Sequence, residues 1–223
     1  MKTSTIILSV ILFIAIVLAV IFYSYWNQTQ SQIQVVNLNI SSSANIFDSQ
    51  LHDLFDQNVL LLIGSTRRSL DSSIATNASI TALQNNINEV GNLLTPIYGY
   101  NTSQQLVNLW NSKFTNVFLN YSIELKNNNS NANADFNTNA AIYEKASIGF
   151  WSNSSNSFPD FNPVTIQNLV SAQLMDVKVA IDAWNYGNYT NYYANQNLAY
   201  GVTGTFADTI AQGIIQQNSQ DFQ

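Results

Sequence analysis

The chain has 223 residues, of which 7 are Lys or Arg and 13 are Asp or Glu, so 9% are charged, whereas about 25% is usual in a soluble domain. It contains no Cys, which excludes disulfides, thiolate metal sites and cysteine nucleophiles, and its one His excludes a metal site built from several histidines. A net charge of −6 argues against nucleic acid as a partner.

Residues 6–23 form an apolar run, IILSVILFIAIVLAVIFY, in which Ser9 is the only polar residue that is not aromatic. A helix of this length spans about 27 Å, close to the thickness of the hydrocarbon core, and Tyr23, Tyr25 and Trp26 follow it as an interfacial aromatic belt. The run is longer than the apolar region of a signal peptide and ends in bulky side chains. Residues 1–26 are therefore predicted to be a cytoplasmic tip and an uncleaved transmembrane signal-anchor, with the lipid bilayer as a partner.

The expected orientation follows from the positive charges. Lys2 and the amino terminus precede the run, and the next basic residue is Arg67, so the positive-inside rule places the N-terminus in the cytoplasm. The C-terminal domain is then predicted to lie outside the cytosol, or in the equivalent place on a virion membrane. Residues 27–45 are polar and lack a helical period, which predicts a stalk before an ectodomain at 46–223.

Apolar residues after the stalk recur at three- and four-residue spacing, which predicts amphipathic helices. The predicted segments are Ser43–Leu70, Asn77 to about Pro96, Thr102–Leu125, Phe136–Phe150, Thr165–Trp184 and Tyr192–Gln217, with polar connections at Asn127–Asp135 and Ser152–Pro163. No strand-like alternation exceeds four residues. The expected fold is all-α: an N-terminal transmembrane helix followed by a helical bundle of about six helices.

Three stretches carry a family resemblance: LHDLFDQNVLLLIGSTRRSL at Leu51–Leu70, INEVGNLLTPIYG at Ile87–Gly99 and FADTIAQGIIQQ at Phe206–Gln217. Together they resemble a bacterial family of small helical-bundle proteins of unassigned function, over about Ser49–Phe222. The family's histidines are missing here. They would fall at Asn58, near Lys113, near Gln173 and Leu174, and at Asn195 and Asn197. The resemblance therefore implies a helical bundle that has lost any ligand held by those histidines.

One predicted polar cluster joins the first and last predicted helices. Asn58 lies on the apolar stripe of its helix and needs a partner, because a buried polar group without one is destabilising. We predict that Arg67 pairs with Asp208 inside the bundle or at its rim, as a structural brace or, alternatively, as part of a ligand site.

The only histidine suggests little chemistry of its own. His52 and Asp56 are spaced to share one helix face, which indicates a solvated pair rather than a metal site. Nothing marks a serine that would complete a catalytic triad. Gly201 and Gly204 follow no predicted strand, so they indicate close helix packing rather than a dinucleotide site.

An aromatic segment, AWNYGNYTNYYANQNLAY, occupies residues 183–200. Its rings either pack in the core at a turn between helices or form an interface or ligand surface. The candidate interface residues are Trp184, Tyr186, Tyr189, Tyr192 and Tyr193. Candidate N-glycosylation sites, whose number is close to the chance expectation, are Asn27, Asn39, Asn77, Asn101, Asn128, Asn153 and Asn188.

These observations favour a membrane-anchored structural or interaction protein, with other proteins of an envelope or capsid assembly as partners. A charge-poor surface rich in amides and hydroxyls suits a virion or a cell envelope, since few charges need desolvation. The alternative is a helical module that binds a small ligand. A membrane-anchored enzyme is least favoured, because no acid, base or nucleophile constellation is visible. No enzymatic activity, cofactor, metal site or nucleic-acid partner is predicted.

Overall fold

The computed structural model describes residues 43–152, 158–159 and 161–222, and the regular structure in this part of the chain is entirely helical. This confirms the all-α prediction. The chain divides into two compact units, residues 1–45 and 46–223, and the second is described below. Its helices are α2 (Ser43–Leu70), α3 (Thr76–Leu109), the π-helix η1 (Trp110–Phe114), α4 (Thr115–Lys126), α5 (Ala132–Trp151), α6 (Pro163–Asn185) and α7 (Tyr189–Gln217).

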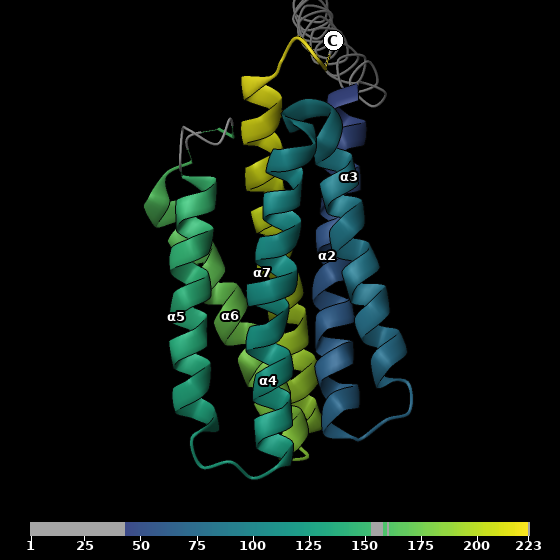
Figure 1. Ribbon diagram of the computed structural model, residues 1–223, viewed down its shortest axis with the longest axis vertical. Coiled ribbons are helices and arrows are strands. Elements are labelled where there is room, and N and C mark those ends of the chain that lie inside the picture. The colour runs from purple at the N-terminus through teal and green to yellow at the C-terminus, as the bar shows by residue number, and fades with distance from the viewer. Residues whose placement is uncertain (1–42, 153–157, 160, 223) are drawn as a thin grey trace, which may run out of the picture. The chain divides into compact units, whose positions relative to one another are not determined.

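The helices of the second unit stand side by side along one axis (Figure 1). α2 and α3 form one antiparallel hairpin, α4 and α5 form a second, and α6 and α7 form a third, so the three short connections 71–75, 127–131 and 186–188 turn the chain at the ends of these pairs. Short connections favour antiparallel neighbours in a bundle. The helical bundle predicted from the apolar spacing is therefore present.

The run from α3 through η1 to α4 changes geometry twice. Gly99 has φ of 77° and ψ of 163°, which interrupts the helix after Pro96, and the Ser103 hydroxyl donates to the Gly99 carbonyl at 3.0 Å. The predicted boundary near Pro96 and Gly99 is thus a kink. Further on, η1 widens one turn of the helix that was predicted to be continuous from Thr102 to Leu125. The hydrogen bonds of a π-turn enclose one residue more than those of an α-helical turn.

The core is rich in aromatic rings that connect distant helices. Phe55 of α2 lies 4.8 Å from Trp110 and 5.8 Å from Phe206 of α7, measured between ring centroids. Phe206 in turn lies 6.1 Å from Trp151 of α5. Ring pairs at these separations stabilise beyond their buried area. The centre of the bundle is therefore filled by side chains.

The predicted membrane localisation is corrected by the structure. Among the described residues, no helix combines the length and the apolar composition that crossing a bilayer requires, because each has a polar face as well as the apolar face that it packs into the bundle. This finding goes against the predicted single-pass topology. The predicted anchor at 1–26 lies outside the described residues, as does the stalk up to residue 42, while Ser43–Asn45 begin α2.

Candidate functional site

Asn58 is buried, as predicted, but its partner is an amide on the neighbouring helix. Its Nδ2 donates to Oδ1 of Asn86 at 3.0 Å, and Nδ2 of Asn86 donates to the backbone carbonyl of Leu54 at 3.0 Å. Both side chains are almost fully covered. This neutral network joins α2 to α3 and leaves no charged group at the centre of the predicted cluster.

The predicted ion pair between Arg67 and Asp208 does not form. Oδ1 of Asp208 lies 2.8 Å from Nδ1 of His52, and the Arg67 guanidinium lies over the ring of Trp184, 5.0 Å from its centroid. Arg67 is near the C-terminal end of α2, whereas the position on α2 that faces Asp208 is His52, four turns earlier. The structure thus gives Asn58, Arg67 and Asp208 three separate partners.

The predicted interface aromatics do gather at one place, the turn between α6 and α7. We call the rings of Trp184, Tyr186, Tyr189, Tyr192 and Tyr193 the aromatic end. Trp184 lies 5.0 Å from Tyr189 and 4.9 Å from Tyr192, which lies 4.9 Å from Tyr193. Tyr192 is 2% exposed, but Tyr186, Tyr189 and Tyr193 are 77%, 54% and 58% exposed. One ring thus belongs to the core and three face outward, and the interface or ligand surface stays a prediction.

The backbone of the aromatic end is held in one conformation. Gly187 has φ of 71°, and its N–H donates to the Trp184 carbonyl at 3.0 Å, while the N–H of Asn188 donates to Ala183 at 2.8 Å. These two bonds close α6 with a glycine in the left-handed region. The Asn188 side chain then accepts from the N–H of Asn191 at 3.2 Å and caps α7. The exposed rings therefore project from a fixed turn.

Trp184 is fixed by two residues from the first hairpin that were not predicted as its partners. Its indole N–H donates to Oδ1 of Asp71 at 2.8 Å, and Arg67 covers its ring. Burial raises the pKa of the neighbouring Tyr192 hydroxyl, and the charge of Arg67 opposes that rise. These contacts join residues more than 100 positions apart in the chain, and no local pattern signals them.

A second polar arrangement surrounds His52, where α2 meets α7. We call His52, Asp48, Asp56, Tyr200 and Asp208 the histidine cluster. Nε2 of His52 lies 3.3 Å from Oδ2 of Asp56, so the predicted pair exists, but Asp56 is 7% exposed and is not solvated. A methyl group added at Gly204 would lie 3.0 Å from Nε2 of His52, so this glycine permits the close approach that the sequence indicated.

The pKa values in the histidine cluster shift in consistent directions. The hydrogen bond that His52 donates to Asp208 raises the pKa of His52, and the charges of Asp56, Asp208 and Asp48 add to this, while burial opposes it. Burial, followed by the charge of Asp208, raises the pKa of Asp48. The hydrogen bond to Asp56 raises the pKa of the Tyr200 hydroxyl. Among the described residues, no group of three or more His, Asp or Glu side chains is placed to hold a metal ion.

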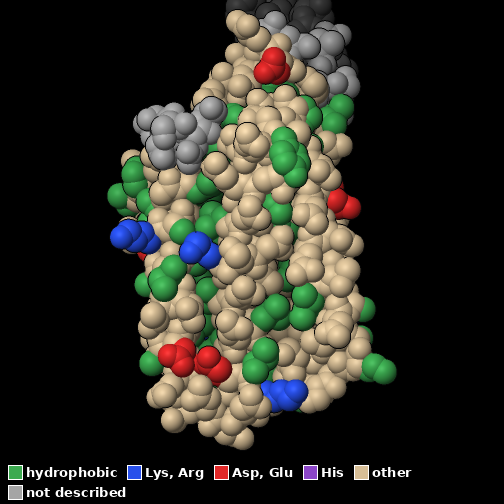
Figure 2. Space-filling view, in the orientation of Figure 1, with side chains coloured by type: hydrophobic (Ala, Val, Ile, Leu, Met, Phe, Trp, Pro, Cys, Tyr) green, Lys and Arg blue, Asp and Glu red, His purple; other side chains and the backbone are tan. Residues whose placement is uncertain are grey.

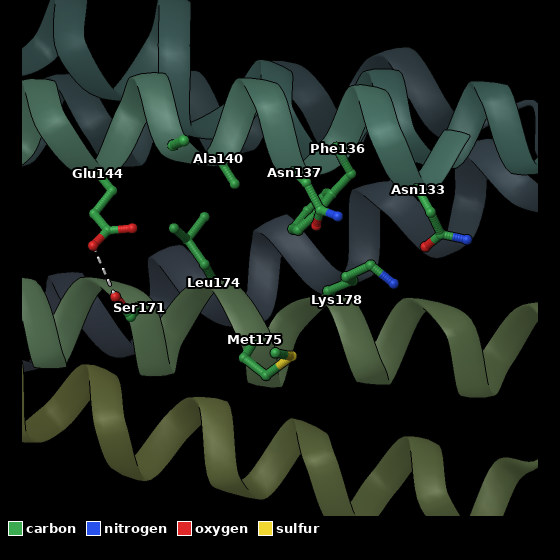
Figure 3. Close-up of a pocket in the computed structure, with 10 residues that line it drawn as sticks. Asn133, Phe136, Asn137, Ala140, Glu144, Ser171, Leu174, Met175 and Lys178 are labelled. Carbon is green, nitrogen blue, oxygen red and sulfur yellow. Dashed lines mark hydrogen bonds between the residues drawn. The ribbon is translucent and has the colours of Figure 1, made fainter. Parts of the chain in front are cut away.

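A shallow groove of about 430 Å³ lies between α5 and α6. Figure 3 shows Glu144 and Ser171 together at one end, Asn133 and Lys178 at the other, and Ala140 opposite Leu174 between them. Glu144 accepts from Ser171 at 3.1 Å, and the Lys178 ammonium lies 2.7 Å from Oδ2 of Asp182. The charged groups at both ends thus already have partners within the protein.

The surface is poor in charge, as the composition indicated. In Figure 2 most of the visible face is uncharged, with a few scattered acidic and basic side chains. The candidate glycosylation sites Asn77, Asn101, Asn128 and Asn188 are exposed, whereas Asn27, Asn39 and Asn153 lie outside the described residues.

Comparison of the chain with protein-family models, with curated proteins and with solved structures finds no match in any of the three. The resemblance to a bacterial helical family stays a prediction. The function must accordingly be inferred from the geometry of the aromatic end, the histidine cluster and the groove.

Proposed function

We propose that this chain is an interaction protein whose helical bundle presents the aromatic end to a protein partner. The observation behind this proposal is the exposure of three tyrosines, Tyr186, Tyr189 and Tyr193, on one turn and the start of the helix that follows it. Tyrosine and tryptophan are enriched among the residues that dominate binding energy at protein interfaces. A group of exposed rings at a fixed turn has the composition of such an interface.

Preorganisation supports the proposal. The turn is held by the hydrogen bonds of Gly187 and Asn188, and Trp184 is held between Arg67 and the neighbouring rings. Binding loses free energy when it must immobilise side chains and loops, so a surface that is already ordered loses less. The aromatic end can therefore bind a partner with little rearrangement.

The charge distribution supports it as well. Residues 183–200 contain no Asp, Glu, Lys or Arg, and the neighbouring charged residues Arg67 and Asp71 already contact Trp184. The core of a protein interface is depleted in charged residues, because their desolvation opposes binding. The partner surface that matches this patch is uncharged and offers acceptors for tyrosine hydroxyls, such as backbone carbonyls or side-chain amides. The role is that of a component of a protein assembly.

The test compares two variants of the full chain. The triple variant Tyr186→Ala, Tyr189→Ala, Tyr193→Ala removes the exposed rings, and Tyr100→Ala removes one that is 66% exposed on α3. Copurification and crosslinking from the native source, quantified by mass spectrometry, should recover a partner that the triple variant loses at least tenfold and the control keeps. Equal recovery by both variants, or no partner enriched by the wild-type chain, would contradict the proposal.

The groove between α5 and α6 supports a second candidate function, the binding of a small amphipathic molecule. Its floor of Phe136, Ala140 and Leu174 is apolar, and Lys178 lies at one end. The amphipathic dye anilinonaphthalene sulfonate, whose fused rings match this apolar floor, is the probe. Its fluorescence should rise with the wild-type chain and fall with Ala141→Phe, which fills the groove, but not with Ala134→Phe on the same helix. Equal fluorescence with both variants would contradict this candidate.

A further inference from the structure

Both ring nitrogens of His52 face carboxylates on different helices. Nδ1 lies 2.8 Å from Oδ1 of Asp208 on α7, and Nε2 lies 3.3 Å from Oδ2 of Asp56 on its own helix α2. A neutral imidazole has only one N–H and presents a lone pair at its other nitrogen. The observed geometry therefore satisfies both carboxylates only when the ring is the doubly protonated imidazolium.

His52 is also the only side chain that can carry a positive charge on α7 and on α2 before Arg67. α7 contains no Lys or Arg, and α2 has none before Arg67, near its far end. The groups around the ring are Asp48 and Asp56 from α2 and Asp208 from α7, with Tyr200 of α7 against Asp56. Three carboxylates thus share one titratable cation, and no permanently charged side chain of these helix segments replaces it.

The packing makes this contact sensitive to its charge. Asp56 is 7% exposed, so its carboxylate has little access to water, and Gly204 of α7 allows the ring to lie against the α7 backbone. A carboxylate removed from water needs a charged or hydrogen-bonded partner. When the imidazolium loses its proton, one of its two carboxylates loses a donor and the carboxylates of the two helices repel each other.

We propose that His52 is a pH-dependent link between α2 and α7: the imidazolium bridges Asp56 and Asp208 and holds the two helices together, and its deprotonation loosens this contact. The link is a property of the bundle itself and does not depend on the partner of the aromatic end. The pKa of His52, raised above its ordinary value by Asp208, places the loosening on the alkaline side of that value.

The single histidine makes the test direct. In the full chain, NMR of the ring carbon and proton gives one titration curve, which should have its midpoint above 6.5, the ordinary value. Asp208→Asn should lower that midpoint, and Asp53→Asn, which removes an exposed carboxylate one residue from His52, should lower it less. A wild-type midpoint at or below the ordinary value, or an equal shift in both variants, would overturn the proposal.

Hydrogen exchange tests the structural consequence. After correction for the intrinsic effect of pH, amides in residues 48–56 and 204–208 should exchange at least threefold faster above the midpoint than below it, while residues 80–90 of α3 keep their protection. His52→Gln and Asp208→Asn should each remove the pH step. If these variants keep the step, or if wild-type protection is the same at both pH values, His52 is not the link.

Discussion

The two ends of α2 are joined to the C-terminal helices by different chemistry. At one end, Arg67 lies against Trp184, whose indole N–H donates to Asp71. Near the other, His52 lies between Asp56 and Asp208. Arginine stays charged at any physiological pH, whereas histidine loses its charge near neutrality. The contact of Arg67 is therefore permanent and that of His52 depends on pH, although both join α2 to the C-terminal pair of helices α6 and α7.

The largest loss in the free energy of unfolding should come from a substitution in the core between these two contacts. Phe55→Ala removes a ring that touches both Trp110 and Phe206, and we expect it to lower the free energy of unfolding by about 3–5 kcal/mol. Leu60→Ala, at a half-exposed site on the same helix, should change it by about 0.5 kcal/mol or less. Urea denaturation measures both. Similar losses would show that α2 does not contribute to the core through Phe55.

The neutral pair of Asn58 and Asn86 lies between the two contacts, and breaking it should cause the second-largest loss of stability. Asn86→Ala leaves the buried amide of Asn58 without its acceptor, so we expect a loss of about 1–3 kcal/mol that does not vary between pH 5 and 9. Asn85→Ala, exposed on the same turn of α3, is the matched control. Urea midpoints at both pH values separate this pair from the histidine cluster. A pH-dependent loss would contradict the neutral network.

The permanent contact of Trp184 with Arg67 and Asp71 should contribute less to the free energy of unfolding. Trp184→Phe keeps a ring under Arg67 but removes the hydrogen bond to Asp71, and the expected loss is about 0.5–1.5 kcal/mol at every pH tested. Thermal unfolding followed by circular dichroism measures it, with the exposed substitution Tyr186→Phe as control. A loss that appeared only at acidic pH would show that this end also depends on titration.

The pH-dependent contact of His52 should contribute least to stability, and its contribution should fall as pH rises. The folded-state pKa of His52 is raised, so its stabilisation is fully present below about 6.5, the unfolded value, and is lost as pH rises through the folded value. Because the side chains of His52 and Asp208 are 37% and 48% exposed, we expect no more than about 1 kcal/mol. The difference in Tm between the wild-type chain and His52→Gln should shrink as pH rises. A difference that grew would reverse the sign of the linkage.

The sequence predicted local features well and distant pairings poorly. The spacing of apolar residues placed α2 at its observed bounds, and the four-residue spacing of His52 and Asp56 predicted their contact. The partners of Arg67 and Asp208 were wrong, because two residues 141 positions apart meet only if helix orientation and register agree. The sequence contains that information only through the packing of the whole bundle.

The same limit applies to the aromatic end and to η1. Residues 183–200 indicated a cluster of rings, but which of them face outward depends on Gly187 and on the packing of Trp184 against α2. The π-turn had no local signal, since its residues suit an α-helix and the widened turn is stabilised by the buried rings of Trp110 and Phe114. Tertiary packing decided both features.

The π-turn also has a consequence for how the chain tolerates changes in its length. One residue added to or removed from an α-helix rotates everything beyond it by about 100° around the axis. Loss of one residue at 111–113 could be absorbed by tightening η1 to an ordinary turn, so that Phe118 and Tyr121 would keep their places in the core. The same loss at Asn120 would rotate Tyr121 away from Asp182 and out of the core. A one-residue deletion in this helix is therefore expected to be tolerated within η1 and not at Asn120.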